Sequence, residues 1–230
     1  MTGNDAEKQP WDPFGTLRRV LWISGGQWAG KSTVARLLAF RYGLTVYHYD
    51  HHDARGHNDR RIARRVKLGR SPADPDPDQM WVNTTPEDMA AETLAGFPVR
   101  FEWALDDLRC LVSGRPIIAE GWGLRPELVA PILDSPRRMV VMVPTRAFRD
   151  RQLRDLPRAA TVGGNVSDPE RAQRNRLERD RLVADDAVRS AQRLGIRVIE
   201  VDGSHDAAAI AGIVADHFSP YLPPPEDRRA

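Results

Sequence analysis

The feature that most constrains the fold is the stretch 20–35, VLWISGGQWAGKSTVA, in which a short apolar run leads through a glycine-rich turn into a helical pattern. Residues 25–32 match the pattern G-x-x-x-x-G-K-[ST]. Glycines allow backbone N–H groups to curl around an anion, and the N-terminus of the following helix adds the positive end of its dipole. The stretch therefore predicts a strand, a phosphate-binding loop and a helix, in that order.

In this pattern Lys31 meets the β- and γ-phosphates of a nucleotide and acts as a catalytic cation, while the Ser32 hydroxyl is a ligand for Mg²⁺. The alternative is a glycine-rich turn with a solvated lysine. The predicted nucleotide contacts are Gly25, Gly26, Gln27, Trp28, Ala29, Gly30, Lys31, Ser32 and Thr33.

Composition sets limits on the class of protein. A chain of 230 residues, of which 41% are hydrophobic, suits one α/β domain of ordinary size. The net charge of +2 does not favour a nucleic-acid partner. Cys110 is the single cysteine, so no internal disulfide can form and we expect a cytoplasmic protein. We expect no membrane partner, because residues 1–13 lack an apolar signal region and no apolar run approaches the roughly 20 residues of a membrane span.

Short apolar runs alternate with helical patterns along the chain, which predicts a parallel sheet covered by helices on both faces. The expected strands are 19–24, 44–50, 116–121, 138–144 and 196–203. The expected helices are 31–42, 100–112, 126–133 and 169–194. Thr85 and Asp168, each followed by a proline, are the expected helix caps.

Domain boundaries follow from composition. Residues 1–13 form a polar tail and residues 219–230 a proline-rich tail, so the folded domain is expected at 14–218. Two segments interrupt the alternation: 51–98, which contains the irregular SPADPDPDQ, and the arginine-rich 146–166. Long excursions from a compact sheet are often functional.

The loop, its flanking strand and helix, and these two excursions resemble the P-loop NTPases, within them the small-molecule and nucleoside or nucleotide kinases. The resemblance implies a three-layer α/β fold with a parallel five-stranded sheet in the order 2-3-1-4-5. It implies ATP with Mg²⁺, a substrate lobe at 51–98 after strand two, and an arginine-bearing lid at 146–166 after strand four.

Acidic residues lie at the carboxyl ends of two of the expected strands. Asp50 ends the second strand, where the open sheet faces its ligand crevice, so we expect it to act as the base for a substrate hydroxyl. Asp53 competes for this role, and Asp50 could instead cap the following turn. Glu120 ends the third strand at a position that resembles a Walker B acid. The family more often has Asp there, so direct Mg²⁺ ligation, contact through water and a substrate hydrogen bond all remain open.

Other side chains near these acids are expected to line the substrate pocket. His51 belongs to a group with His52 and His57 that has no zinc-site spacing, so we interpret it as polar pocket lining. Trp122 is interpreted either as a wall of the pocket or as a packed core residue. The predicted substrate contacts are therefore Asp53, His51, Glu120 and Trp122.

Arginines gather in two places. After the fourth strand, Arg151 and Arg154 are the expected catalytic residues and Arg149 the expected nucleotide contact, although a solvated helix with salt bridges would look the same. A second basic cluster at 60–70 is expected on an amphipathic helix, as solvated surface or as a site for an anionic substrate.

The sequence thus predicts an ATP-dependent kinase that phosphorylates a hydroxyl of a nucleoside, sugar or antibiotic-like molecule. One alternative is a nucleotide or polynucleotide kinase. Another is a nucleotide-binding regulatory module without transfer activity. The GTPase base motif N/T-K-x-D is absent after the fourth strand, where the chain reads MVVMVPTRAF. The acceptor and the oligomeric state are left open by the sequence.

Overall fold

The computed structural model describes residues 11–111, 113–156 and 165–226. Most of the predicted N-terminal tail, the last four residues of the C-terminal tail and part of the predicted lid, 157–164, therefore lie outside the described residues.

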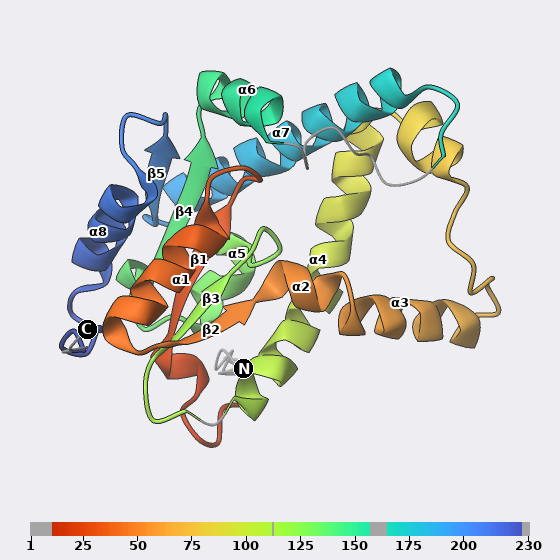
Figure 1. The fold of residues 1–230 in the computed structure, drawn as a ribbon. Helices are drawn as coiled ribbons and strands as arrows, with labels where there is room; N and C mark the ends of the chain where they lie inside the picture. The colour runs from red at the N-terminus through yellow and green to blue at the C-terminus, as the bar shows by residue number, and fades with distance from the viewer. Residues whose placement is uncertain (1–10, 112, 157–164, 227–230) are drawn as a thin grey trace, which may run out of the picture.

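The centre of the molecule is a five-stranded, all-parallel sheet in the order β2-β3-β1-β4-β5, which confirms the predicted order (Figure 1). The strands are β1 (Val20–Gly25), β2 (Thr45–His48), β3 (Ile117–Glu120), β4 (Met139–Pro144) and β5 (Arg197–Val201). Because β1 is central, the glycine-rich loop leaves the sheet between β3 and β4. The carboxyl ends of parallel strands form the ligand crevice of such sheets.

Helices cover both faces of the sheet, as predicted. Along β1, Leu21 and Ile23 belong to a core shared with α1 (Lys31–Tyr42) and α8 (Ala207–Phe218). The alternate residues Val20 and Trp22 belong to a second core. That core is shared with α4 (Pro86–Cys110), α5 (Pro126–Val129) and α7 (Pro169–Arg193). The period-2 alternation of a strand thus produces the two apolar interfaces.

The helix α4 begins earlier than predicted. We expected it to begin at residue 100, because Gly96 and Pro98 disfavour the interior of a helix. Pro98 lacks an N–H and leaves a carbonyl of the preceding turn without its helical donor. That carbonyl belongs to Leu94. The guanidinium of Arg100 donates to two nearby carbonyls, those of Thr93 and Gly96, over 2.9 and 3.1 Å. Thr85 caps the helix, as predicted, by accepting from the N–H of Asp88.

The excursion after β2 forms a helical lobe beside the sheet (Figure 1). It contains α2 (Tyr49–Asp53), α3 (Gly56–Lys67), the single-turn π-helix η2 (Gln79–Asn83) and the beginning of α4. The proline- and aspartate-rich segment between α3 and η2 has no regular structure over 70–76, as predicted, but residues 77–79 of the predicted irregular stretch are helical. Strand β2 ends at His48, so Asp50 lies in the first turn of α2 and not on the strand.

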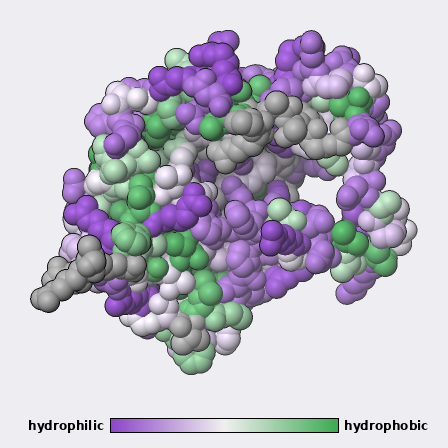
Figure 2. All heavy atoms as spheres, in the orientation of Figure 1, coloured by the Kyte–Doolittle hydropathy of each residue, from purple (hydrophilic) through white to green (hydrophobic). Residues whose placement is uncertain are grey.

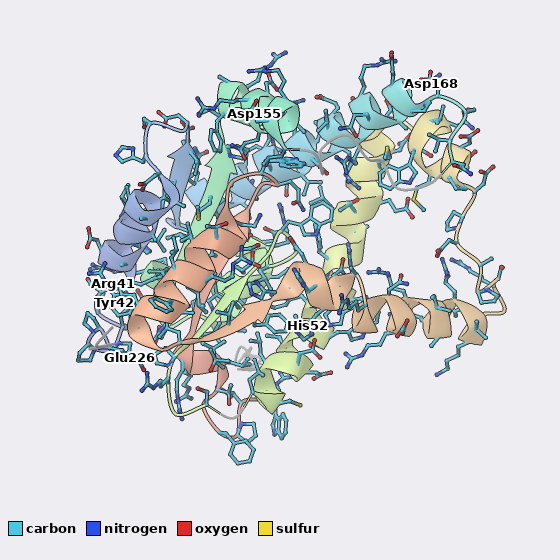
Figure 3. All side chains as sticks on the ribbon, viewed as in Figure 1. Arg41, Tyr42, His52, Asp155, Asp168 and Glu226 are labelled. Atoms are coloured by element: carbon cyan, nitrogen blue, oxygen red, sulfur yellow. The ribbon has the colours of Figure 1, made fainter. Side chains whose placement is uncertain are left out.

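The remaining elements complete the connections. After β4 the chain forms α6 (Arg146–Asp155), and Figure 3 marks its last residue and the Asp168 cap of α7. The predicted helix at 126–133 divides into α5 and a 3₁₀ turn. The 3₁₀ turns are η1 (Leu17–Arg19), η3 (Ala130–Ile132) and η4 (Pro136–Arg138).

The described part of the C-terminal tail packs back onto the domain. The N–H of Glu226 donates to the carbonyl of Arg41 at the end of α1, and its carboxylate pairs with Arg115 (Figure 3).

Candidate functional site

The glycine-rich loop has a backbone that requires its glycines. Gly25 has φ of +122°, and a Cβ there would lie 2.0 Å from the carbonyl oxygen of Met142. Gly30 has φ of +77° and is the N-cap of α1, with open space beside it. Trp28 adopts a φ of 67°, which is uncommon outside glycine. A strained, tightly turned loop of this kind brings backbone N–H groups to face one point.

Lys31 lies over this loop. Its side chain is buried, and Nζ donates to the carbonyl of Gly26 over 2.7 Å. Within the described residues no carboxylate oxygen pairs with this ammonium. The N-terminus of α1 has no side-chain cap, so its first N–H groups lack an acceptor within the helix. The loop therefore presents positive charge and unused donors, which is the arrangement that binds a phosphate.

The remaining loop residues divide by position. Ala29 is buried in the α1-side core, so it can contribute only backbone groups. Gln27 and Trp28 line a cavity of about 340 Å³ beside α7. Ser32 is half-buried and Thr33 is exposed, both in the first turn of α1.

Asp50 is held at the edge of this loop. Its Oδ1 accepts from the backbone N–H of Trp122 over 3.2 Å. Gly121 makes this contact possible, because a Cβ there would lie 2.9 Å from the same oxygen. Burial raises the pKa of Asp50, the positive charge of Lys31 lowers it, and the negative charge of Glu120 raises it again. The carboxylate therefore lies in the electrostatic field of Lys31 and Glu120.

Glu120 is fully buried at the end of β3. Its Oε1 lies 2.6 Å from Nδ1 of His48, while Oε2 has no hydrogen-bond partner among the described residues. The Oγ of Ser24, on the adjacent β1, is also buried without a partner. An unsatisfied buried carboxylate oxygen beside the phosphate loop fits the hydration shell of a hard cation such as Mg²⁺.

Asp53 is engaged elsewhere. Its two carboxylate oxygens pair with Arg61 over 2.8 Å and with Arg100 over 3.1 Å. These arginines take up the acceptor capacity that a proton acceptor would need, so the geometry favours Asp50 over Asp53 as the base.

The histidines do not gather into a metal site. His51 is exposed, with its ring centroid 5.4 Å from that of His48. His57 is buried, and its Nε2 lies 2.8 Å from Oδ2 of Asp107. In the described ranges no group of three or more His, Cys, Asp or Glu side chains could hold a metal ion.

Trp122 packs against the core and also lines a cavity. Its ring packs edge-on against the buried ring of Phe97, with centroids 5.3 Å apart. It also lines a cavity of about 630 Å³ between α3, η2, α4 and α7.

The arginines of α6 point in different directions. Arg149 lines the same cavity as Gln27 and Trp28. Arg151 instead reaches the β5–α8 connection, where its guanidinium lies 3.5 Å from the carbonyl of Asp202. Arg154 is exposed on α6. Of the three predicted residues, the structure places Arg149 beside the loop.

A further arginine was missed by sequence analysis. On α7, Nε and one terminal nitrogen of Arg176 are buried without a hydrogen-bond partner among the described residues. Burial raises the pKa of Asp180, and the charges of Arg179, Arg176 and Arg149 partly oppose this by lowering it. The sequence of α7 is rich in arginine throughout, so no local signal distinguishes Arg176 from its neighbours.

The chain matches none of the protein-family models and none of the curated proteins with which it was compared. Among the helices that the structure describes, none combines the length and the apolar character needed to cross a membrane.

Proposed function

We propose that the protein is an ATP-dependent phosphotransferase of the P-loop type, which transfers the γ-phosphoryl group to a hydroxyl of a small molecule. The observation that carries this proposal is the buried Lys31 ammonium, which no described carboxylate neutralises, at the uncapped N-terminus of α1. A buried charge without a counterion is costly, and a bound phosphate group would supply the missing negative charge.

The loop would hold the phosphates through its backbone N–H groups, with Lys31 replacing its contact to Gly26 by one to the phosphate oxygens. Ser32 and Glu120 would hold Mg²⁺, Ser32 through its hydroxyl and Glu120 through water. When bound, the cation would neutralise part of the phosphate charge. The unpartnered Oε2 of Glu120 supports this assignment.

Asp50 is the proposed base. As the acceptor oxygen forms its bond to the γ-phosphorus, the bond from that phosphorus to the β,γ-bridging oxygen breaks, and the hydroxyl proton moves to a carboxylate oxygen of Asp50. The products are ADP and a phosphate monoester. Burial raises the pKa of Asp50 and thereby makes it a better proton acceptor than a solvated aspartate.

Arg149 and Arg176 are the proposed partners of the transferring group. Arg149 lines the cavity beside Gln27 and Trp28, and Arg176 acts electrostatically on Asp180 of the same cavity. Each arginine has a buried nitrogen without a hydrogen-bond partner among the described residues, although Nε of Arg149 lies 3.9 Å from the carboxylate of Asp150. Such donors stabilise the transition state most if they form hydrogen bonds to the phosphoryl oxygens on which negative charge develops.

The test is a product analysis with ATP, Mg²⁺ and a panel of hydroxyl compounds that includes nucleosides, sugars, aminoglycosides and phosphorylated alcohols. The proposal predicts ADP together with an acceptor heavier by one phosphoryl group, and no product in Lys31→Ala protein. Formation of ADP and free phosphate only would instead favour a regulatory nucleotide-binding module.

A further inference from the structure

The cavity of about 630 Å³ behind Trp122 differs from an ordinary substrate pocket in the charge of its walls. It lies between α3, η2, α4 and α7, and its opening is visible in Figure 2 as a gap between α3 and η2 with largely hydrophilic edges. Six arginines line it: Arg61, Arg64, Arg65, Arg70, Arg100 and Arg179.

Carboxylates neutralise only part of this charge. Glu92 is the acid in the described lining. Asp53, Asp74 and Asp180 each pair with arginines of the wall. Six arginines against these four carboxylates leave a formal excess of two positive charges. A phosphate monoester carries about −1.5 to −2 at neutral pH, which matches that excess.

The cavity also has flat aromatic walls. Trp81, Trp103 and Trp122 line it, and the guanidinium of Arg179 lies 5.3 Å from the ring centroids of both Trp81 and Trp122. Indole and guanidinium planes stack on planar rings, so the walls accept a ring attached to the anion.

The cavity is joined to the proposed base by two contacts. Trp122 lines the cavity with its ring and binds Asp50 with its backbone N–H. Asp53, three residues after Asp50, fixes the cavity arginines Arg61 and Arg100. Trp122 therefore separates the cavity from Asp50 by a single residue.

We propose that the acceptor is itself a phosphate monoester with a free hydroxyl, and that this cavity binds its phosphate. That the bound molecule is the phosphoryl acceptor rests on the proposed function, but the binding of a phosphate monoester can be measured without ATP. The volume of about 630 Å³ lies within the usual range of small-molecule sites and is large enough for a nucleotide or a sugar phosphate.

The experiment is isothermal titration of the full chain with adenosine monophosphate, ribose 5-phosphate, adenosine and ribose, in the absence of ATP. All four are titrated into Lys31→Ala protein as well, because the phosphate loop could itself bind a phosphate. The expected result is binding of at least one phosphorylated compound at least about tenfold tighter than that of its neutral counterpart, in both proteins. Equal affinities within each pair, or loss of phosphate binding in Lys31→Ala, would overturn the proposal.

A variant series locates the bound phosphate. Arg64 and Arg70 are exposed lining residues, so the double substitution Arg64→Gln/Arg70→Gln should fold, and it should weaken phosphate binding by about tenfold. The matched control is Lys67→Gln, an exposed cation on the same helix α3 that is not in the lining. Equal affinities of the double variant and the control would place the anion elsewhere and overturn the assignment.

The titrations also show which part of the ligand is recognised, and together with the product analysis they separate the binding site from the proposed function. Binding of both phosphorylated compounds assigns the recognition to the phosphate alone, and binding of adenosine monophosphate alone assigns it to phosphate plus ring. Either result supports the cavity. If phosphate binds there but no compound is phosphorylated by ATP, the proposed function is wrong while the binding site stands.

Discussion

The backbone N–H of Trp122 donates a hydrogen bond of 3.2 Å to Oδ1 of Asp50, and this contact joins the two halves of the proposed site. On one side, Asp50 lies in the electrostatic field of Lys31 and the phosphate loop. On the other, the Trp122 ring forms part of the arginine-lined cavity. Trp122, which binds the proposed base, thus also lines the cavity proposed for the acceptor.

Replacing Lys31 by alanine should abolish ATP turnover and weaken ATP binding by at least about tenfold, because the ammonium is the buried cation at the phosphate loop. The fold should persist, since the side chain has one hydrogen bond to a loop carbonyl and no carboxylate partner among the described residues. Titration calorimetry and circular dichroism measure the two effects. Lys67→Ala, which removes an exposed lysine from α3, is the control and should retain full activity.

Asp50→Asn should lower kcat by at least about a hundredfold while changing ATP affinity little, because it removes the proton acceptor and keeps the shape. Asp53→Asn should behave differently. It leaves Arg100 and Arg61 without their carboxylate and should lower stability by about 2 kcal/mol. Steady-state kinetics and chemical denaturation of both variants separate the roles. If Asp50→Asn protein kept its activity while Asp53→Asn protein was inactive but stable, Asp53 and not Asp50 would be the base.

The pH dependence of kcat/KM for the acceptor should have an acidic limb above the ordinary aspartate pKa of 3.8, because burial raises the pKa of Asp50. As the pH falls through that raised pKa, Asp50 becomes protonated and can no longer accept the hydroxyl proton. The residual activity of Asp50→Asn should lack this limb. Superimposable pH profiles for the two proteins would assign the limb to another group.

Two glycines of the loop should respond unequally to alanine. Gly25→Ala places a Cβ against the backbone of Met142 at a positive φ and should cost about 3 kcal/mol or more. Gly30→Ala meets open space and adds only the strain of the left-handed conformation, about 1 kcal/mol. Thermal denaturation compares the two, and equal losses of stability would contradict the described loop conformation.

Arg149→Gln should reduce kcat by at least about tenfold, because Arg149 lies beside Gln27 and Trp28 of the loop. Arg151→Gln should have little effect, since that side chain is directed to the carbonyl of Asp202. This order reverses the one inferred from the sequence. Kinetics of both variants at saturating ATP decide between them, and a larger loss in Arg151→Gln would restore the original order.

Much of the fold could be predicted because it depends on local patterns. The apolar runs mark the five strands to within two residues at each end, and the loop pattern places the turn between β1 and α1. The start of α4 could not be predicted in this way. Gly96 and Pro98 indicate a break, yet the helix runs through both, and Arg100 donates to the nearby carbonyls of Thr93 and Gly96.

The site was predictable to the extent that it follows the strand ends. Asp50 and Glu120 were identified from their positions at the ends of the expected second and third strands, and the charges of Glu120 and Lys31 both act on Asp50. The pairing of Asp53 with Arg100 spans 47 residues, and no local pattern contains it. The buried nitrogens of Arg176 likewise depend on how α7 packs against the sheet, which the arginine-rich sequence does not reveal.

Mass spectrometry of the reaction mixture measures directly whether the protein transfers a phosphoryl group from ATP to a hydroxyl. The full chain is incubated with ATP, Mg²⁺ and the panel of hydroxyl compounds, with Lys31→Ala and Asp50→Asn proteins in parallel. We expect ADP and one acceptor heavier by a phosphoryl group with the unaltered chain, and neither product with Lys31→Ala. Unchanged ATP with every compound, or the same product in all three proteins, would contradict the proposed function.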